Sequence, residues 1–480
     1  MNEVQRIVKN ISVTGLAQVL TSLMAFVLFI YLARILGEAD FGKYSFSISL
    51  TTLLATLTDL GVNQLLVREI ARDKDLSENY INNAIILTMP LGVITLTIVP
   101  LISWLLSLSK EMTILLYLFG FYNVLLTISG TYLSLFQAWE RMEYVAIFQI
   151  IERSVTVTLG LAVLFMGYGV FAVALVYVAA GVLDILIAAS ISFKRFVRPS
   201  FKFDPALQWR LLVEGLPFGL NSLFAMFFFK IDTVLLGILR DDVAVGIYNA
   251  AYNPLLNLSM IIAGMVSSAV YPVMSRQFTN GGDILENFTM VSSKYLSIIS
   301  FPIATGCLIL ADRFISLFYG GGYTASIIAF QILSLFIPIR LVSTITGTLL
   351  SSINRQGFRM LSVGLSATLN IILNIILIPL YSYIGASIAT VMSELFLYML
   401  FLHYIGRYYK PVNVNSTFKK PAIASVIMGV AVHLMKDLNL LIMILLASCI
   451  YLGVLILIRT FDEKDKMILM KLMGRNHEEC

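Results

Sequence analysis

A few charged side chains embedded in long apolar segments are the residues best able to do chemistry in this sequence. Lys230 and Asp232 lie near the middle of one such segment. Residues two positions apart point away from each other on a helix, so these two do not simply form a local ion pair. We interpret Lys230 as a residue that attracts an anionic group. Asp232 then pairs with a cation from another helix or takes up an ion. The alternative for both residues is a structural link between helices.

Three arginines inside or beside apolar segments are candidates for the same anionic group. Arg153 follows Glu152, and Arg340 lies close to Pro338. A planar guanidinium donates two hydrogen bonds at once, which suits a phosphate. Arg34 lies near the end of the first apolar segment, where it either joins this site or extends its charged head to water.

Three amides and two further carboxylates complete the candidate site. Asn249, Asn253 and Asn257 repeat every four residues and therefore share one face of a helix. This stripe either lines a hydrated path that binds sugar hydroxyls or makes hydrogen bonds between helices, each contributing about 1 kcal/mol or less. Asp59 and Glu394 are candidates for ion coupling, but a structural ion pair is the favoured interpretation of both.

Composition shows which elements must position these residues. Hydrophobic residues make up 59% of the 480 residues and charged residues 13%, against about 25% charged in an ordinary globular domain. Uncharged runs long enough to cross a bilayer recur along the chain, and such a run needs about 20 apolar residues. The runs do not alternate as barrel strands do. The sequence therefore predicts an all-α polytopic membrane protein with about 14 transmembrane helices.

Two pairs of these predicted spans follow each other at short intervals. The first pair is Ile11–Leu36 and Tyr44–Val67, and the second is Met360–Leu380 and Ile384–Ile405. Most of the 33 Lys and Arg residues fall on the side that holds both termini. Because cytoplasmic loops are enriched in Lys and Arg, we predict that the N and C termini are cytoplasmic.

The second half of the sequence looks like a diverged copy of the first. Shifted back by about 200 positions, Gly215-Leu216 falls on Gly15-Leu16, and Gly246 falls close to Gly42. Six spans separate the copies, which predicts a parallel repeat with a substrate path between the halves. The predicted organisation is a six-helix lobe (1–193), a basic cytoplasmic linker (194–211), a second six-helix lobe (212–405), two additional helices (406–459) and a cytoplasmic tail (460–480).

Several other function classes find no support in the sequence. The three cysteines and three histidines are scattered and show no metal-ligand spacing. No phosphate-binding Gly-Lys-Ser/Thr loop and no catalytic set is present, so we expect neither an enzyme nor a cofactor. The net charge of +5 does not indicate nucleic acid, since in a membrane protein the location of Lys and Arg matters more. The basic linker instead suits anionic membrane lipids.

Three stretches carry a resemblance to a known family: Tyr31–Leu50, Asp59–Arg72 and Phe229–Tyr252. They resemble the Wzx-type polysaccharide-biosynthesis flippases of the multidrug/oligosaccharidyl-lipid/polysaccharide exporter superfamily. The resemblance implies two lobes around a central cavity in the cell membrane, working by alternating access. It also implies transfer of a polyprenyl-(pyro)phosphate-linked oligosaccharide from the cytoplasmic to the outer leaflet. Lys230 occupies the family's usual Lys/Arg-Ile-Asp position, where the resemblance implies contact with the phosphate.

Two other functions remain open at this point. A cation-coupled multidrug exporter of the same superfamily would favour an acidic, aromatic cavity, so Lys230 counts against it. A scaffold, or a membrane-embedded glycan ligase or polymerase, is the third class. Such an enzyme normally needs a large outer loop, and the predicted outer loops are short. With no ATPase signature present, the driving force is expected to be an ion gradient, the membrane potential or the substrate's own gradient, with H⁺ and Na⁺ as the candidate coupling ions.

Overall fold

The computed structural model describes residues 3–200, 202–280, 282–410, 414–435, 438–461 and 465, and over this part of the chain it contains helices and no strand. The elements are α1 (Glu3–Asp59), α2 (Val62–Arg72), η1 (Lys74–Leu76), α3 (Ser77–Leu105), α4 (Lys110–Ala138), α5 (Met142–Phe165), α6 (Val170–Arg195), α7 (Pro205–Leu239), α8 (Asp242–Asn280), α9 (Gly282–Ile309), α10 (Ala311–Tyr319), η2 (Gly320–Tyr323), α11 (Ser326–Ser334), α12 (Phe336–Ser352), α13 (Gln356–Tyr408), α14 (Val414–Leu434) and α15 (Leu440–Leu457).

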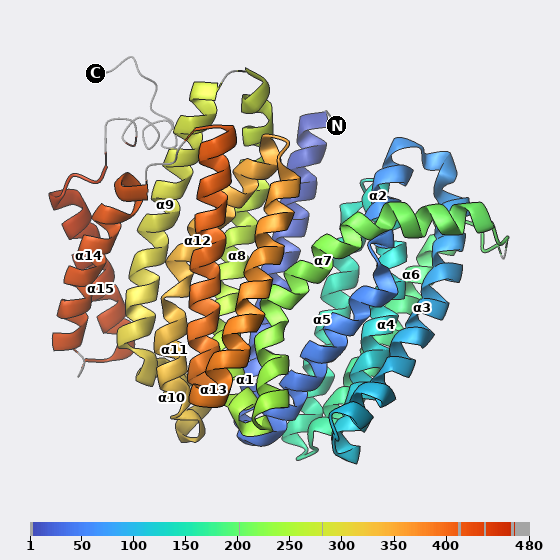
Figure 1. Ribbon diagram of the computed structural model, residues 1–480, viewed down its shortest axis with the longest axis horizontal. Coiled ribbons are helices and arrows are strands. Elements are labelled where there is room, and N and C mark those ends of the chain that lie inside the picture. Colours follow the sequence, from blue (N-terminus) through green and yellow to red (C-terminus); the bar gives the residue numbers. More distant parts are fainter. Residues whose placement is uncertain are drawn as a thin grey trace.

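The helices form two groups joined by α1 and α7 (Figure 1). We call α2–α6 the first group, and α8–α13 together with the C-terminal part of α7 the second group. Helix α7 lies across one end of the first group and then descends into the second. Helices α14 and α15 pack on the outer edge of the second group. The predicted tail, 460–480, lies outside the described residues apart from Thr460, Phe461 and Asp465.

Two of the longest helices are each broken by a sharp bend. In α1 the bend is at Gly37, with φ 75° and ψ 176°. In α13 it is at Ser382, whose φ of 53° is a conformation that non-glycine residues rarely adopt. Both bends fall between the paired spans predicted from the sequence, so each long helix consists of two helical segments that meet at the bend.

The lengths and apolar character of the helices fit a membrane. Among the described residues, eleven helices are long and apolar enough to cross a bilayer. Many of their large apolar side chains are exposed, including Leu101, Trp104, Leu186 and Leu445. Water would not accept so much exposed apolar surface, whereas lipid would. The prediction of an all-α multi-pass membrane protein is confirmed.

A reciprocal contact between α1 and α8 brings the two halves of the chain together. A Cβ on Gly42 would lie 1.7 Å from the carbonyl oxygen of Asp242, and a Cβ on Gly246 would lie 2.0 Å from that of Glu38. Only glycine fits at either position, and small residues of this kind let membrane helices approach closely. The repeated glycines of the sequence therefore lie where the two halves meet.

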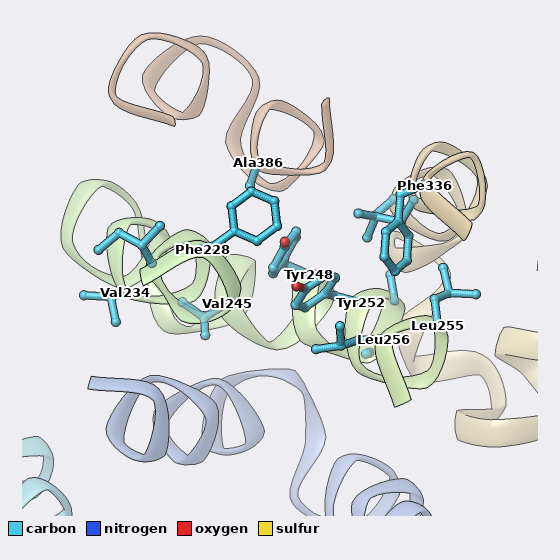
Figure 2. Close-up of a cluster of buried hydrophobic side chains, with 14 of the residues drawn as sticks. Phe228, Val234, Val245, Tyr248, Tyr252, Leu255, Leu256, Phe336 and Ala386 are labelled. Atoms are coloured by element: carbon cyan, nitrogen blue, oxygen red, sulfur yellow. The ribbon is translucent and has the colours of Figure 1, made fainter. Parts of the chain in front are cut away.

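The apolar core of the second group surrounds a pair of tyrosines. Tyr248 and Tyr252, one turn apart on α8, stack with ring centroids 5.2 Å apart. Figure 2 shows them between Phe228 of α7 and Phe336 of α12, with Ala386 of α13 nearby. Buried tyrosine hydroxyls usually need hydrogen-bond partners. One such partner is Asp232, which accepts a hydrogen bond from the Tyr248 hydroxyl.

Candidate functional site

A cavity of about 700 Å³ opens where α7 crosses from the first group to the second. It is lined by α7, α8, α12 and α13, together with Arg68 of α2. Asn221, Ala225 and Phe229 face it with the four-residue spacing of one helix face. The polar lining residues include Arg68, Glu214, Asn221, Arg340, Gln356 and Arg359. Such a mixture of guanidinium, amide and aromatic groups can bind an anion that also carries hydroxyl groups.

Arg340 lies in the wall of this cavity, as a site for an anion requires. Its guanidinium stacks over the Phe229 ring at 4.6 Å, and its Nη1 lies 3.5 Å from Oε2 of Glu394. Glu394 is buried and also accepts a hydrogen bond of 2.8 Å from the Ser343 hydroxyl. The Nε of Arg340 is buried and has no hydrogen-bond partner. Glu394 thus holds the arginine in place but leaves hydrogen-bonding capacity unused.

Two arginines that the sequence argument missed also line the cavity. Arg68 is bound by Glu69 at 2.8 Å and by Glu214 at 2.6 Å. Arg359 donates a hydrogen bond of 3.0 Å to the Ser351 hydroxyl, and no carboxylate pairs with it in the described part of the chain. Both residues lie at the ends of apolar segments, where sequence reasoning assigns Lys and Arg to cytoplasmic loops. The sequence did hold one indication for Arg359: this residue directly precedes Met360, where a predicted transmembrane span begins.

Lys230 is not among the residues that line this cavity, although its neighbour Phe229 is. Its side chain is half-buried and makes no hydrogen bond or ion pair with any described residue. The structure therefore brings Arg340, but not Lys230, to the cavity. An ammonium group without a partner inside a membrane protein calls for water or a ligand.

Asp232 is fully buried and bound by neutral donors from other positions of the second group. It accepts hydrogen bonds from the Asn374 amide at 2.5 Å and from the Tyr248 and Thr390 hydroxyls at 3.0 Å each. As the spacing of the two residues predicts, it does not pair with Lys230. The expected cationic partner is not found: no ion pair joins Asp232 to a described residue. The Oδ1 atom of Asn374 is buried without a hydrogen-bond partner, which adds an unused oxygen acceptor beside the carboxylate.

Arg153 lies apart from Arg340, inside the first group. Its Nε is 3.8 Å from Oε2 of Glu152. Glu152 is buried and accepts hydrogen bonds from the Tyr122 hydroxyl at 2.8 Å and the Thr156 hydroxyl at 3.1 Å. This arginine therefore has its own carboxylate, and it does not line the cavity that contains Arg340.

The asparagine stripe does not follow a single path. The buried Asn249 accepts hydrogen bonds from the Thr233 hydroxyl at 3.2 Å and the Asn253 amide at 2.9 Å. The first of these joins α7 to α8, which is the interhelical alternative. Asn257 instead lines a separate, largely apolar cavity of about 490 Å³ between α1, α8, α9 and the last two helices.

The two remaining candidates lie at the ends of helices. Arg34 is exposed and makes no hydrogen bond with a described residue, which agrees with a side chain that extends to water. Asp59 ends α1, and its Oδ1 accepts a hydrogen bond of 3.1 Å from the Asn63 amide at the start of α2. The predicted span Tyr44–Val67 was therefore too long, because Leu60 and Gly61 adopt positive φ and break the helix. Asp59 holds this break together and forms no ion pair with a described residue.

Comparison with known proteins places this architecture among transporters. A family model described as "Polysaccharide biosynthesis protein" matches residues 7–278. The chain is 25% identical over 390 residues to the "Probable low-salt glycan biosynthesis flippase Agl15" of Haloferax volcanii, covering 79% of each protein. The solved structure of the lipid II flippase MurJ in an inward closed conformation superimposes with a TM-score of 0.76 at 14% identity, over 96% of this chain and 99% of that one.

A second solved structure shows how widely this fold is used. An inward-facing multidrug resistance transporter of the MATE family and MOP superfamily matches with a TM-score of 0.68 at 17% identity, over 82% of this chain and 97% of that one. The fold and the family are those of a membrane transporter rather than of a catalytic enzyme. The chain belongs to the polysaccharide biosynthesis protein family.

Proposed function

We propose that this protein carries a polyprenyl-(pyro)phosphate-linked oligosaccharide from the cytoplasmic to the outer leaflet of the cell membrane by alternating access. The observation that carries the proposal is the cavity at α7, where guanidinium, amide and aromatic side chains meet. Two relatives are named as probable flippases, one of them for glycan biosynthesis, and these names support a glycan-containing substrate. A charged headgroup costs several kcal/mol to move through hydrocarbon. A hydrated, positively charged cavity lowers that cost while the prenyl chain stays in the lipid.

The proposed topology has fourteen crossings with both termini in the cytoplasm. Eleven described helices are long and apolar enough to cross a bilayer. The bends at Gly37 and Ser382 each divide one of these helices into two crossings, and α14 adds one more. The reciprocal contact of Gly42 and Gly246 supports two related lobes, 1–193 and 212–405. In this arrangement the cavity lies toward the cytoplasmic end.

The proposed roles of individual residues follow from their partners. Arg340 contacts the phosphate in the cavity, because its Nε has hydrogen-bonding capacity that no described residue uses. Lys230, which follows the lining residue Phe229 but does not itself line the cavity, contacts the phosphate when the helices rearrange during alternating access. Asp232 takes up the coupling ion, H⁺ or Na⁺, because it is a buried carboxylate without a cation. Arg153 serves as the charge partner of Glu152 in the first lobe, and Glu394 serves as the charge partner of Arg340 in the second. The basic linker, 194–211, binds anionic lipid at the membrane surface.

Reconstitution into vesicles tests this function directly. A fluorescently labelled polyprenyl-pyrophosphate glycan should become accessible on the far leaflet at a rate that depends on the protein. Lys230→Ala should abolish complementation of a flippase-null strain while the protein remains in the membrane. Export of a cationic drug without movement of the lipid-linked glycan would instead establish the multidrug exporter.

A further inference from the structure

The two ends of α13 carry a cluster of aromatic rings. The helix turns back at Ser382, so its first and last turns both lie at the end of the bundle where α1 begins (Figure 1). Phe358 of the first turn contacts Tyr404 and Tyr408 near the end of the helix, with ring centroids 4.7 Å apart in both pairs. The three rings therefore join the two segments of α13 and hold their ends in a fixed position.

Two exposed arginines lie against this aromatic cluster, and no carboxylate pairs with either of them in the described part of the chain. The guanidinium of Arg355 is 4.6 Å from the centroid of the Tyr408 ring, and that of Arg407 is 5.7 Å from it. Both distances are in the range of a cation–π interaction. In contrast, Arg141 at the start of α5 pairs with Glu143. Two cations held on one ring repel each other, so an anion beside them lowers the energy of the surface.

An exposed apolar stripe runs along α13 from these arginines toward the middle of the membrane. Met392, Met399 and Arg407 follow each other at intervals of seven and eight residues, so they lie on one face of the helix. Met392 and Met399 are about half exposed, and so are Leu361 and Leu365 on the other segment. In a membrane this stripe faces acyl chains. A pair of free cations at the head of an apolar stripe matches the layout of a phospholipid with an anionic headgroup.

We propose that this surface binds an anionic phospholipid, with its headgroup phosphate on Arg355 and Arg407 and its acyl chains along the stripe that contains Met399. A guanidinium stacked on an aromatic ring keeps its N–H groups available for a two-point contact with phosphate oxygens. Tyrosine rings also favour the depth of the headgroups. Since the proposed topology puts this end of the bundle in the cytoplasm, the lipid belongs to the cytoplasmic leaflet.

The site is separate from the two regions already described. Neither Arg355 nor Arg407 lines the cavity at α7. The basic linker is attached to the first group, where the Asn82 amide donates a hydrogen bond of 2.9 Å to the Arg198 carbonyl. The lipid on α13 is therefore a ligand of the second group alone, and it holds the two segments of that helix from outside.

Quenching by brominated lipid tests the site at a known place on the protein. Cys307, Cys449 and Cys480 are replaced by alanine, Met399→Cys is labelled with bimane, and the full-length protein is reconstituted into phosphatidylcholine vesicles. Brominated phosphatidylglycerol should associate next to the label about 25-fold more strongly than brominated phosphatidylcholine, since each arginine near the surface contributes about a factor of five. The double substitution Arg355→Gln/Arg407→Gln should remove this preference.

Further variants separate loss of the site from loss of the fold. Arg407→Gln alone should reduce the preference about five-fold, and Tyr408→Leu should reduce it less, because both charges remain but are no longer held on a ring. The matched control is Arg141→Gln/Arg198→Gln, which removes two charges from the first half of the chain and should leave the preference unchanged. Equal unfolding temperatures in phosphatidylcholine show that each variant is folded.

Two results would overturn the proposal: equal quenching by the two brominated lipids in the unsubstituted protein, or a preference that survives Arg355→Gln/Arg407→Gln. Displacement of brominated phosphatidylglycerol by less farnesyl phosphate than unlabelled phosphatidylglycerol would also overturn it, because the site would then hold a prenyl phosphate. None of these measurements requires transport. A protein that shows the arginine-dependent preference but moves no lipid-linked glycan would keep this site and lose the proposed function.

Discussion

Two buried carboxylates, Glu152 in the first group and Asp232 in the second, are neutralised in different ways. In the first group, Glu152 lies 3.8 Å from Arg153, the next residue of the same helix, and also accepts a hydrogen bond from the Tyr122 hydroxyl. In the second group, Asp232 is held by neutral donors such as the Tyr248 hydroxyl, and no described residue forms an ion pair with it. One carboxylate therefore has a built-in counter-charge and the other does not.

The difference indicates where a change of helix packing can affect charge. Adjacent residues of one helix move together, so the Glu152–Arg153 pair persists when helices shift. The Arg340–Glu394 pair joins α12 to α13, and Asp232 of α7 is bound by Asn374 of α13. These contacts depend on how the helices are placed. If the protein works as proposed, we expect the charge-dependent steps of transport to involve these contacts, where an ion or ligand can favour one arrangement.

The largest expected effect is on the response to ions when Asp232 loses its charge. Asp232→Asn keeps the shape and the ability to accept hydrogen bonds but removes the carboxylate. We expect cation-driven transfer of the lipid-linked glycan to fall about 10- to 100-fold, the usual range of coupling between sites. Glu152→Gln is the matched control and should still respond to the gradient. Transfer rates in vesicles with an imposed Na⁺ or H⁺ gradient measure both, and an unchanged response in Asp232→Asn would place the coupling elsewhere.

The next largest effect is a difference in the loss of unfolding free energy when either partner of the Arg340–Glu394 pair is replaced. Glu394 is 2% exposed, whereas Arg340 borders the cavity. Arg340→Gln leaves a buried charge alone and should cost about 3 kcal/mol of unfolding free energy. Glu394→Gln leaves an arginine that reaches the cavity, so it should cost less. Unfolding in mixed micelles measures both, and the double substitution should recover part of the loss. Equal losses would show that the cavity does not hydrate Arg340.

The sequence was sufficient to predict the parts of this comparison that depend on local pattern. Long apolar runs predicted the helices, and the predicted span boundaries after Leu36 and Leu380 fall next to the two bends. The spacing of Lys230 and Asp232 excluded a local pair. Periodicity alone shows which residues share a helix face. It does not show which neighbouring helix meets that face.

The remaining features depend on how separate helices pack. Arg359 and Arg68 lie at helix ends, where a basic residue is ordinarily a loop residue, and only the crossing of α7 brings them to one cavity. Lys230 has the position that the family resemblance marks, yet it is not among the residues that line the cavity. Two of the three hydrogen-bond donors to Asp232, Asn374 and Thr390, lie more than 100 positions away in the sequence, and no local pattern predicts them.

A smaller effect is expected from the compensated pair of the first group. Glu152→Gln removes the carboxylate that pairs with Arg153 in the described part of the chain, and the Arg153 side chain is 30% exposed. The cost should be about 1–2 kcal/mol of unfolding free energy, because Gln still accepts the Tyr122 and Thr156 hydrogen bonds. Unfolding in mixed micelles measures this loss. Adding Arg153→Met should restore much of it by removing the orphaned cation. No recovery in the double substitution would mean that Arg153 is stabilised by something other than Glu152.

The smallest effects should distinguish a charged from a neutral hydrogen bond between helices. In the first group the Ser129 hydroxyl donates to buried Asp184 at 2.5 Å, and in the second the Thr233 hydroxyl donates to Asn249 at 3.2 Å. Ser129→Ala should cost about 1.5 kcal/mol, near the upper limit for such bonds in membranes. Thr233→Val should cost about 0.6 kcal/mol, since Asn249 keeps the hydrogen bond from Asn253. The same unfolding measurement compares them. A larger loss for Thr233→Val than for Ser129→Ala would contradict this order, because the neutral hydrogen bond between α7 and α8 would then contribute more stability than the charged one.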